Sequence, residues 1–215
     1  MKKLWLAIIF STFYFASHAQ SGKLYFGLSQ NFGLDRQNIT VGSATSQMSM
    51  TSTVGLNFGV GIDIYNAFEV VAGAGYLLHF GYTANRTNGN TTTASESFNI
   101  KRLNLGIANT FEISEKVGVR AEFGYDFSFP GTLNVKVGSE EHGEVTYGNV
   151  TSFYARVGFP VKISDKLRLI PTLGYHGGQF EAETYGNGDI FDLDPSVFFL
   201  DASSIELGLN LAMYL

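Results

Sequence analysis

The sequence predicts an all-β protein: an eight-stranded antiparallel up-and-down transmembrane β-barrel with short periplasmic turns and long outer loops. Three observations support this prediction. Apolar residues alternate with small or polar residues in eight segments, the links between these segments are alternately short and long, and the chain begins with an export signal. Such strands have one face that suits lipid and another that suits a narrow interior.

The alternation is clearest from Val54 to Ile64, where every second residue is apolar and Gly, Asn and Asp stand between. A period of two is that of a β-strand whose faces meet different surroundings. In one segment Lys101 and Arg102 interrupt the phase at the outer end. Most segments exceed the roughly 9–11 residues that cross a bilayer, so some strands should project beyond it. The eight segments are 24–32, 53–64, 68–82, 98–113, 117–129, 151–163, 167–177 and 203–215.

The links between the strands differ sharply in length. Three are hairpin turns, around residues 65–67, 114–116 and 164–166. The segment 83–97 is polar and low in complexity, which predicts a mobile loop. Short links on one side, long links on the other and an even number of strands are typical of outer-membrane barrels. The long, polar links lie near 33–50, 83–97, 130–150 and 178–202.

Residues 1–19 have the pattern of a secretory signal peptide. Lys2 and Lys3 precede an apolar run over residues 4–16, and Ser17-His18-Ala19 supplies small residues at the expected cleavage site. The run is shorter than a membrane helix of about 20 residues. We therefore expect residues 20–215 to form one barrel domain that reaches the cell outer membrane through the periplasm. The chain has no Cys, so neither a cysteine-linked lipid anchor nor a disulfide is expected.

Composition supports a membrane barrel over its alternative, a soluble barrel of the lipocalin type. Charged residues make up 15% of the chain, against about 25% in soluble domains. The second face of the strands is rich in Gly, Ala and Asn, which suits a narrow lumen, whereas a soluble barrel would carry Lys, Glu, Thr and Ser there. The net charge of −5 argues against nucleic acid as a partner.

In the pattern of its strands and links, the chain resembles the small outer-membrane β-barrel domain family that includes OmpX-like and opacity-type surface proteins. The resemblance spans nearly all of residues 20–215 and rests on pattern and topology, without a short diagnostic motif. It implies an integral outer-membrane protein. We expect a monomer that contacts outer-membrane lipids and lipopolysaccharide, and the barrel-assembly machinery during insertion; no surface ligand is indicated.

Three classes of function are compatible with such a barrel: a structural or surface-interaction protein acting through its extracellular loops, a narrow porin-like channel, and a lipid-modifying enzyme. Eight strands enclose an interior just wide enough for side chains, which disfavours a channel. Acyl transfer needs a Ser beside a His that an acid orients, and no Ser adjoins His79, His142 or His176 in the sequence. The interaction protein is the favoured class, with no catalytic residue, cofactor or metal ligand predicted.

One long link is strongly acidic. It contains no Lys or Arg, and its carboxylates are the kind of hard oxygen ligand that divalent cations prefer. A solvated acidic loop is the favoured interpretation, and a cation site is the alternative. The acidic residues are Glu181, Glu183, Asp189, Asp192, Asp194 and Asp201.

Charged residues near the turns predict a network inside the barrel. Asp63 and Glu69 face inward opposite one another, and Lys162 and Arg168 occupy equivalent positions four strands away. Since unpaired buried charges are costly, we expect the acidic pair to meet the basic pair across the interior. The alternative is that these side chains reach periplasmic water. The predicted network consists of Asp63, Glu69, Glu112, Arg120, Lys162 and Arg168.

Overall fold

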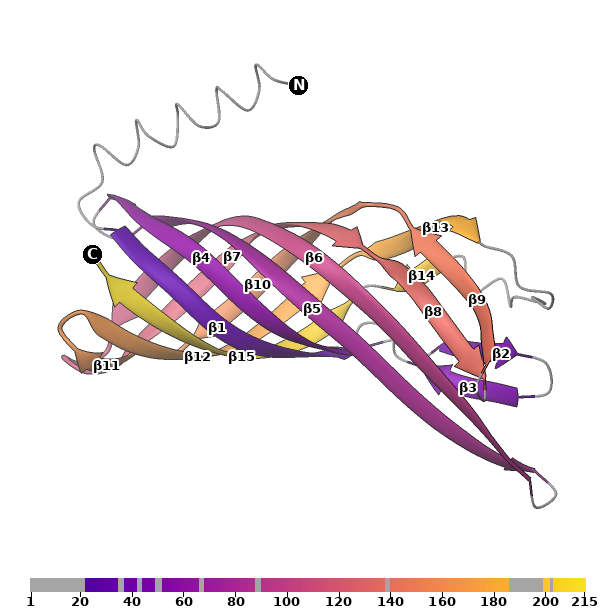
Figure 1. The fold of residues 1–215 in the computed structure, drawn as a ribbon. Coiled ribbons are helices and arrows are strands. Elements are labelled where there is room, and N and C mark those ends of the chain that lie inside the picture. The colour runs from indigo at the N-terminus through magenta and orange to yellow at the C-terminus, as the bar shows by residue number, and fades with distance from the viewer. Residues whose placement is uncertain are drawn as a thin grey trace.

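The computed structural model describes residues 22–34, 37–41, 44–48, 52–65, 68–87, 90–137, 140–185, 199–201 and 203–215 (Figure 1). The predicted signal peptide and most of the acidic link, residues 186–198, lie outside the described residues. Within the described ranges, no helix is long and apolar enough to cross a membrane.

Eight strands close into an antiparallel barrel, which confirms the predicted fold class. Each barrel strand pairs with the next one along the chain, and pairing of the first with the last closes the ring. A short strand, β11 (Val161–Ser164), also pairs with the first residues of the seventh barrel strand. The barrel strands are β1 (Gly22–Gly33), β4 (Thr53–Tyr65), β5 (Phe68–Thr87), β6 (Asn90–Glu112), β7 (Gly118–Pro130), β10 (Val150–Gly158), β12 (Leu167–Gly177) and β15 (Ser204–Tyr214).

The segment 83–97 is not the loop that its composition predicts. β5 and β6 stay paired as far as Thr87 and Asn90. This is well beyond Leu78, the last residue of β5 that pairs with β4. Pairing satisfies the backbone hydrogen bonds of this polar stretch, and its threonines favour extended backbone. Polarity alone therefore gave the wrong secondary structure here.

Further strands extend the wall of the barrel on its long-link side. The outer part of β6 pairs with β8, which leads through β9 and β13 to β14, and a separate hairpin is formed by β2 and β3 (Figure 1). We call β8, β9, β13 and β14, with the outer parts of β5 and β6, the sheet extension. The added strands are β2 (Gln37–Val41), β3 (Ala44–Met48), β8 (Thr132–Val137), β9 (Glu140–Tyr147), β13 (Gln179–Tyr185) and β14 (Phe199–Asp201).

The two faces of the barrel wall follow the predicted alternation. On β7, Phe123 is 58% exposed on the outside, whereas Asp126 is fully buried inside. The expected break of phase on β6 does not exist: Lys101 points outward and is exposed, and Arg102 points inward and is buried. Their order fits the alternation once the inward face is recognised as charged and not only small.

Gly106 makes room for a large inward side chain. Gly106 on β6 pairs with Gly124 on β7, and a Cβ atom on Gly106 would lie 2.3 Å from the hydroxyl of Tyr154. That ring is 1% exposed and stacks on the imidazole of His176, with 5.8 Å between centroids. Gly106 therefore lies where the side chain of Tyr154, from β10, crosses the interior.

The outward face should tolerate a charge only near its edges. Phe123→Arg places a cation at mid-height on β7, which should lower the free energy of unfolding by about 2–4 kcal/mol in a bilayer. Thr151→Arg puts the same charge on the outward face at the loop end of β10 and should cost about 0–1 kcal/mol. Urea unfolding of the refolded variants in vesicles measures both. Equal effects at the two positions would contradict the lipid-facing assignment.

Candidate functional site

A cluster of charges fills the interior towards the turn end of the barrel. The ammonium of Lys23 on β1 donates to Asp63 Oδ1 at 2.7 Å and to Glu69 Oε2 at 2.8 Å. Arg120 on β7 also binds Glu69, through Nη1 at 2.7 Å and Nη2 at 3.2 Å. The Tyr25 hydroxyl donates to Glu69 Oε1 at 2.6 Å. Glu69 on β5 is therefore a buried carboxylate held by three donor side chains, two from β1 and one from β7, and neither of these strands is adjacent to β5.

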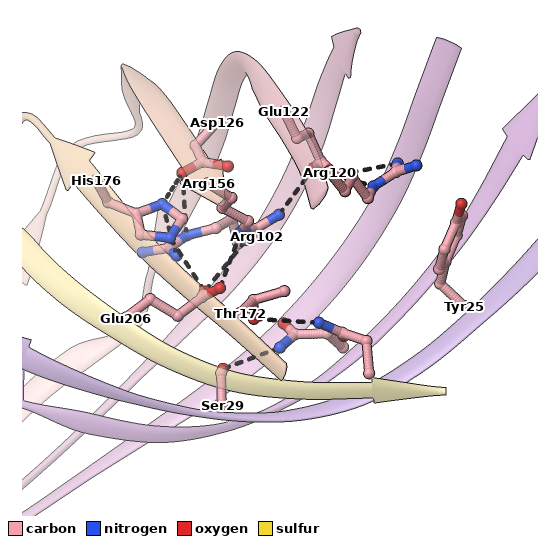
Figure 2. A network of polar contacts seen from close by, with 12 residues as sticks. Tyr25, Ser29, Arg102, Arg120, Glu122, Asp126, Arg156, Thr172, His176 and Glu206 are labelled. Atoms are coloured by element: carbon pink, nitrogen blue, oxygen red, sulfur yellow. Dashed lines mark hydrogen bonds and ion pairs between the residues drawn. The ribbon is translucent and has the colours of Figure 1, made fainter. Parts of the chain in front are cut away.

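A second cluster lies at mid-height and is built around Arg156 and His176 (Figure 2). Arg156 on β10 donates to both carboxylate oxygens of Glu206, from Nε at 2.8 Å and Nη2 at 3.1 Å. His176 Nδ1 lies 2.5 Å from Asp126 Oδ2, and its Nε2 lies 3.0 Å from Glu206 Oε2. Arg102 completes this cluster, with Nη1 3.2 Å from His176 Nδ1.

Glu122 on β7 joins the two clusters. It accepts from Arg156 Nη1 at 3.2 Å, and from Arg120 Nε at 3.3 Å and Nη2 at 3.2 Å. The result is a continuous network that crosses the interior from β1 to β12; we call it the lumen network, and Figure 2 shows much of it. Charge-assisted and bidentate hydrogen bonds of this kind are the stronger ones in proteins.

The charges of the lumen network nearly balance. Four cationic side chains, Lys23, Arg102, Arg120 and Arg156, share the interior with five carboxylates, Asp63, Glu69, Glu122, Asp126 and Glu206. His176 lies between two of these carboxylates, Asp126 and Glu206, with one ring nitrogen near each. Balance matters because an unpaired buried charge costs several kcal/mol.

The structure places the six predicted network residues in three different settings. Glu69 and Arg120 form a buried ion pair, and Asp63 joins them through Lys23. Glu112 and Arg168 pair at the exposed turn end, at 2.5 Å. Lys162 pairs with Asp165 in the following turn at 2.7 Å, and its hydrogen bond holds the pKa of the Asp165 carboxyl below its usual range.

The predicted pairing of the acidic hairpin with the basic hairpin across the barrel is therefore wrong. The register is as expected, because Asp63 lies opposite Glu69 and Lys162 lies opposite Arg168. However, Lys23 on the adjacent strand β1 reaches the acidic pair more directly than residues four strands away. The basic pair lies at the edge of the barrel, where Glu112 and Asp165 neutralise it.

Sequence reasoning missed several members of the lumen network, although the alternation could have found them. Lys23 precedes the predicted start of the first strand at residue 24, and β1 begins at Gly22. In the sequence, Arg102 looks like a break in the alternation. Glu122 and Glu206 stand in the inward phase between apolar neighbours, so each could have been assigned to the interior. What the sequence lacks is the pairing between strands far apart in the barrel.

An apolar cluster fills the interior above the lumen network, at the loop end. Leu77, Phe98 and Ile100 point inward from the barrel wall, and Ile100 lies one inward position beyond Arg102 on β6. Phe98 packs against Tyr147 and Phe180, with ring centroids 5.7 Å and 6.3 Å apart. We call this cluster the apolar plug; it consists of Leu77, Phe98, Ile100, Leu133, Val145, Tyr147 and Phe180.

Little space remains inside the barrel. A cavity of about 60 Å³ lies within the lumen network, beside Tyr25, Arg102, Arg120 and Arg156. At about 10–15 Å³ per water, this volume holds roughly four to six water molecules. Water molecules in this cavity can hydrate the buried guanidinium groups of Arg102, Arg120 and Arg156.

The structure describes the side chains of two histidines, His79 and His176. Ser204 lies opposite His176 in the register of β12 and β15, but both ring nitrogens face carboxylates. His79 Nδ1 lies 2.6 Å from the backbone oxygen of Ser52. The side chain of His142 lies outside the described part.

Comparisons with known proteins extend the assignment of the fold. No family model and no curated protein matches the sequence. Among solved structures, the outer membrane protein OprG from Pseudomonas aeruginosa is 7% identical, with 92% of this chain and 97% of that chain covered and a TM-score of 0.58. Neisserial surface protein A is 9% identical, with 89% and 96% covered and a TM-score of 0.52. The chain thus has the fold of the small eight-stranded outer-membrane barrels, as the resemblance in its sequence implied.

Proposed function

We propose that the chain is an integral protein of a bacterial outer membrane whose closed barrel supports a surface-exposed sheet extension, and that it acts as a structural or surface-interaction protein. The main support is the filled interior: the lumen network occupies its lower and middle levels, and the apolar plug occupies its loop end. Because side chains fill the interior, we infer that the protein acts through the surface of the sheet extension.

The membrane location rests on three features. The outward face is apolar around the barrel, the solved barrels with the same fold include outer-membrane proteins, and residues 1–19 have the pattern of an export signal. In this orientation the short turns face the periplasm and the sheet extension faces outward. Outer-membrane lipids and lipopolysaccharide would surround the barrel, and the barrel-assembly machinery would insert it.

The alternative is a narrow porin-like channel, for which the polar cavity within the lumen network is the favourable observation. A continuous path would have to cross both the ion pairs and the apolar plug. Conductance measurements separate the two functions.

A closed barrel should not conduct. Residues 20–215, refolded and added to planar bilayers, should give no stable current steps, because ion pairs and apolar side chains fill the interior. As a matched control, Phe98→Ala combined with Phe180→Ala removes two rings of the apolar plug and should produce transient conductance if the plug contributes to closure. Stable steps from the parent protein would establish the channel instead.

The orientation can be tested with single cysteines, since the chain contains none. Thr87→Cys lies at the tip of the β5–β6 hairpin, and Glu115→Cys lies in the turn between β6 and β7. A membrane-impermeant maleimide should label the first variant on intact cells and should label the second only after the outer membrane is permeabilised. Labelling of Glu115→Cys on intact cells would reverse the proposed orientation.

A further inference from the structure

The outside of the barrel carries a groove between two rows of side chains. The rows run across neighbouring strands, because residues paired in the sheet register stand side by side on the same face. The groove has a volume of about 1020 Å³ and continues to Leu169 at one end and Phe129 at the other. One row contains Leu211, Phe26, Phe58, Ala74 and Leu103, and the other contains Leu209, Leu28, Leu56, Tyr76 and Lys101.

The groove climbs the barrel obliquely. It begins at Leu211, in the half of β15 nearer the turns, and rises to Lys101 on β6. The path crosses four strand spacings of about 4.8 Å, or roughly 19 Å along the row. With strands tilted by about 45°, this corresponds to a climb of roughly 13 Å, close to half of a hydrocarbon layer of about 30 Å. One extended acyl chain of a single leaflet matches this path.

A single cation stands at the upper end of the groove. Of the charged side chains described in the barrel wall, Lys101 alone points outward; the others face the interior or lie at the turns. Its register neighbours on the two adjacent strands are Tyr76 and Phe129. The next outward residue of β6 towards the loop end is Asn99, whereas on β5 the apolar face continues as far as Phe80. Lys101 thus lies near the loop end of the apolar face, close to the depth at which we expect a lipid head group.

The small side chain of Ala74 gives the groove its depth beside this cation. It stands between Phe58 and Leu103 in its row and adjoins Tyr76 and Lys101 in the next. The apolar groove ends at the hydroxyl of Tyr76 and the ammonium of Lys101. This arrangement matches a molecule with an acyl chain and an acidic head group. Such charge complementarity points to an anionic lipid and away from a neutral one.

We propose that the groove binds one anionic lipid of the leaflet at the loop end of the barrel. Lys101 and the Tyr76 hydroxyl bind its phosphate, and one acyl chain lies between the two rows towards Leu211. This inference rests on the proposed function, because it requires the barrel to be inserted in a membrane. It adds a specific lipid site to a surface that would otherwise contact lipids without preference.

Native mass spectrometry tests this site directly. Residues 20–215 are refolded and released from micelles that contain either phosphatidic acid or phosphatidylcholine with the same acyl chains. The parent should retain one phosphatidic acid molecule in a saturable manner and prefer it about fivefold over phosphatidylcholine. An excess of inorganic phosphate should leave the complex intact, because the acyl chain contributes to binding. Displacement by phosphate would mean a soluble-anion site and would overturn the proposal.

Four variants separate the groove from general effects. Lys101→Gln removes the cation and should reduce phosphatidic acid binding about fivefold. Ala74→Phe fills the groove and should also weaken phosphatidic acid binding. Lys116→Gln removes a lysine in a turn, and Ala121→Phe adds a ring to the outward face of β7, away from the groove; both should bind as the parent does. Binding by Lys101→Gln equal to that of the parent overturns the lipid site.

The shift of each folded variant on unheated gels reports insertion independently of lipid binding. If the parent inserts and shows no preference between the two lipids, the lipid site fails while the proposed barrel function stands. If the parent does not insert into lipid bilayers, the proposed function fails, and this inference fails with it.

Discussion

The small interior of an eight-stranded barrel is the constraint on which the rest of this structure depends. Eight strands leave a space that side chains alone can fill, so each inward residue must fit its neighbours in both volume and charge. Gly106 admits the ring of Tyr154, and carboxylates such as Glu69 and Glu206 lie where guanidinium groups can reach them. A charge left unpaired there would be costly, which explains why the network is continuous.

The same alternation that fills the interior also defines the exterior. Inward charges on the strands are flanked by outward apolar residues, as Glu122 is by Ala121 and Phe123. Among the described charged side chains of the wall, Lys101 is the exception to the apolar face, and it lies near the loop end of that face. Towards the loop end, β5 and β6 continue as a paired sheet, and β6 pairs with β8 there (Figure 1). The barrel wall thus continues into the sheet extension. The apolar plug closes the interior at this transition.

The fold could be predicted because a period of two and the alternation of short and long links leave few other arrangements. The extension could not be, since the polar segment 83–97 has the composition of a loop and forms strands only through pairing. For the charges, the sequence gives the facing of Asp63 and Glu69 correctly. It does not give the stagger of the closed barrel, which brings Lys23 and Arg120 to Glu69 and leaves Arg168 with Glu112.

The most direct measurement of the central claim, that paired charges hold the interior closed, is a double-mutant cycle on Arg156 and Glu206. Urea unfolding in vesicles gives the free energies of the parent, Arg156→Met, Glu206→Gln and the double variant. Each single variant should lose about 3 kcal/mol or more, because it leaves a buried partner unpaired. The double variant should lose less than the sum of the two by about 2–3 kcal/mol, the coupling of residues in direct contact. Losses that add to within about 0.5 kcal/mol would contradict the account.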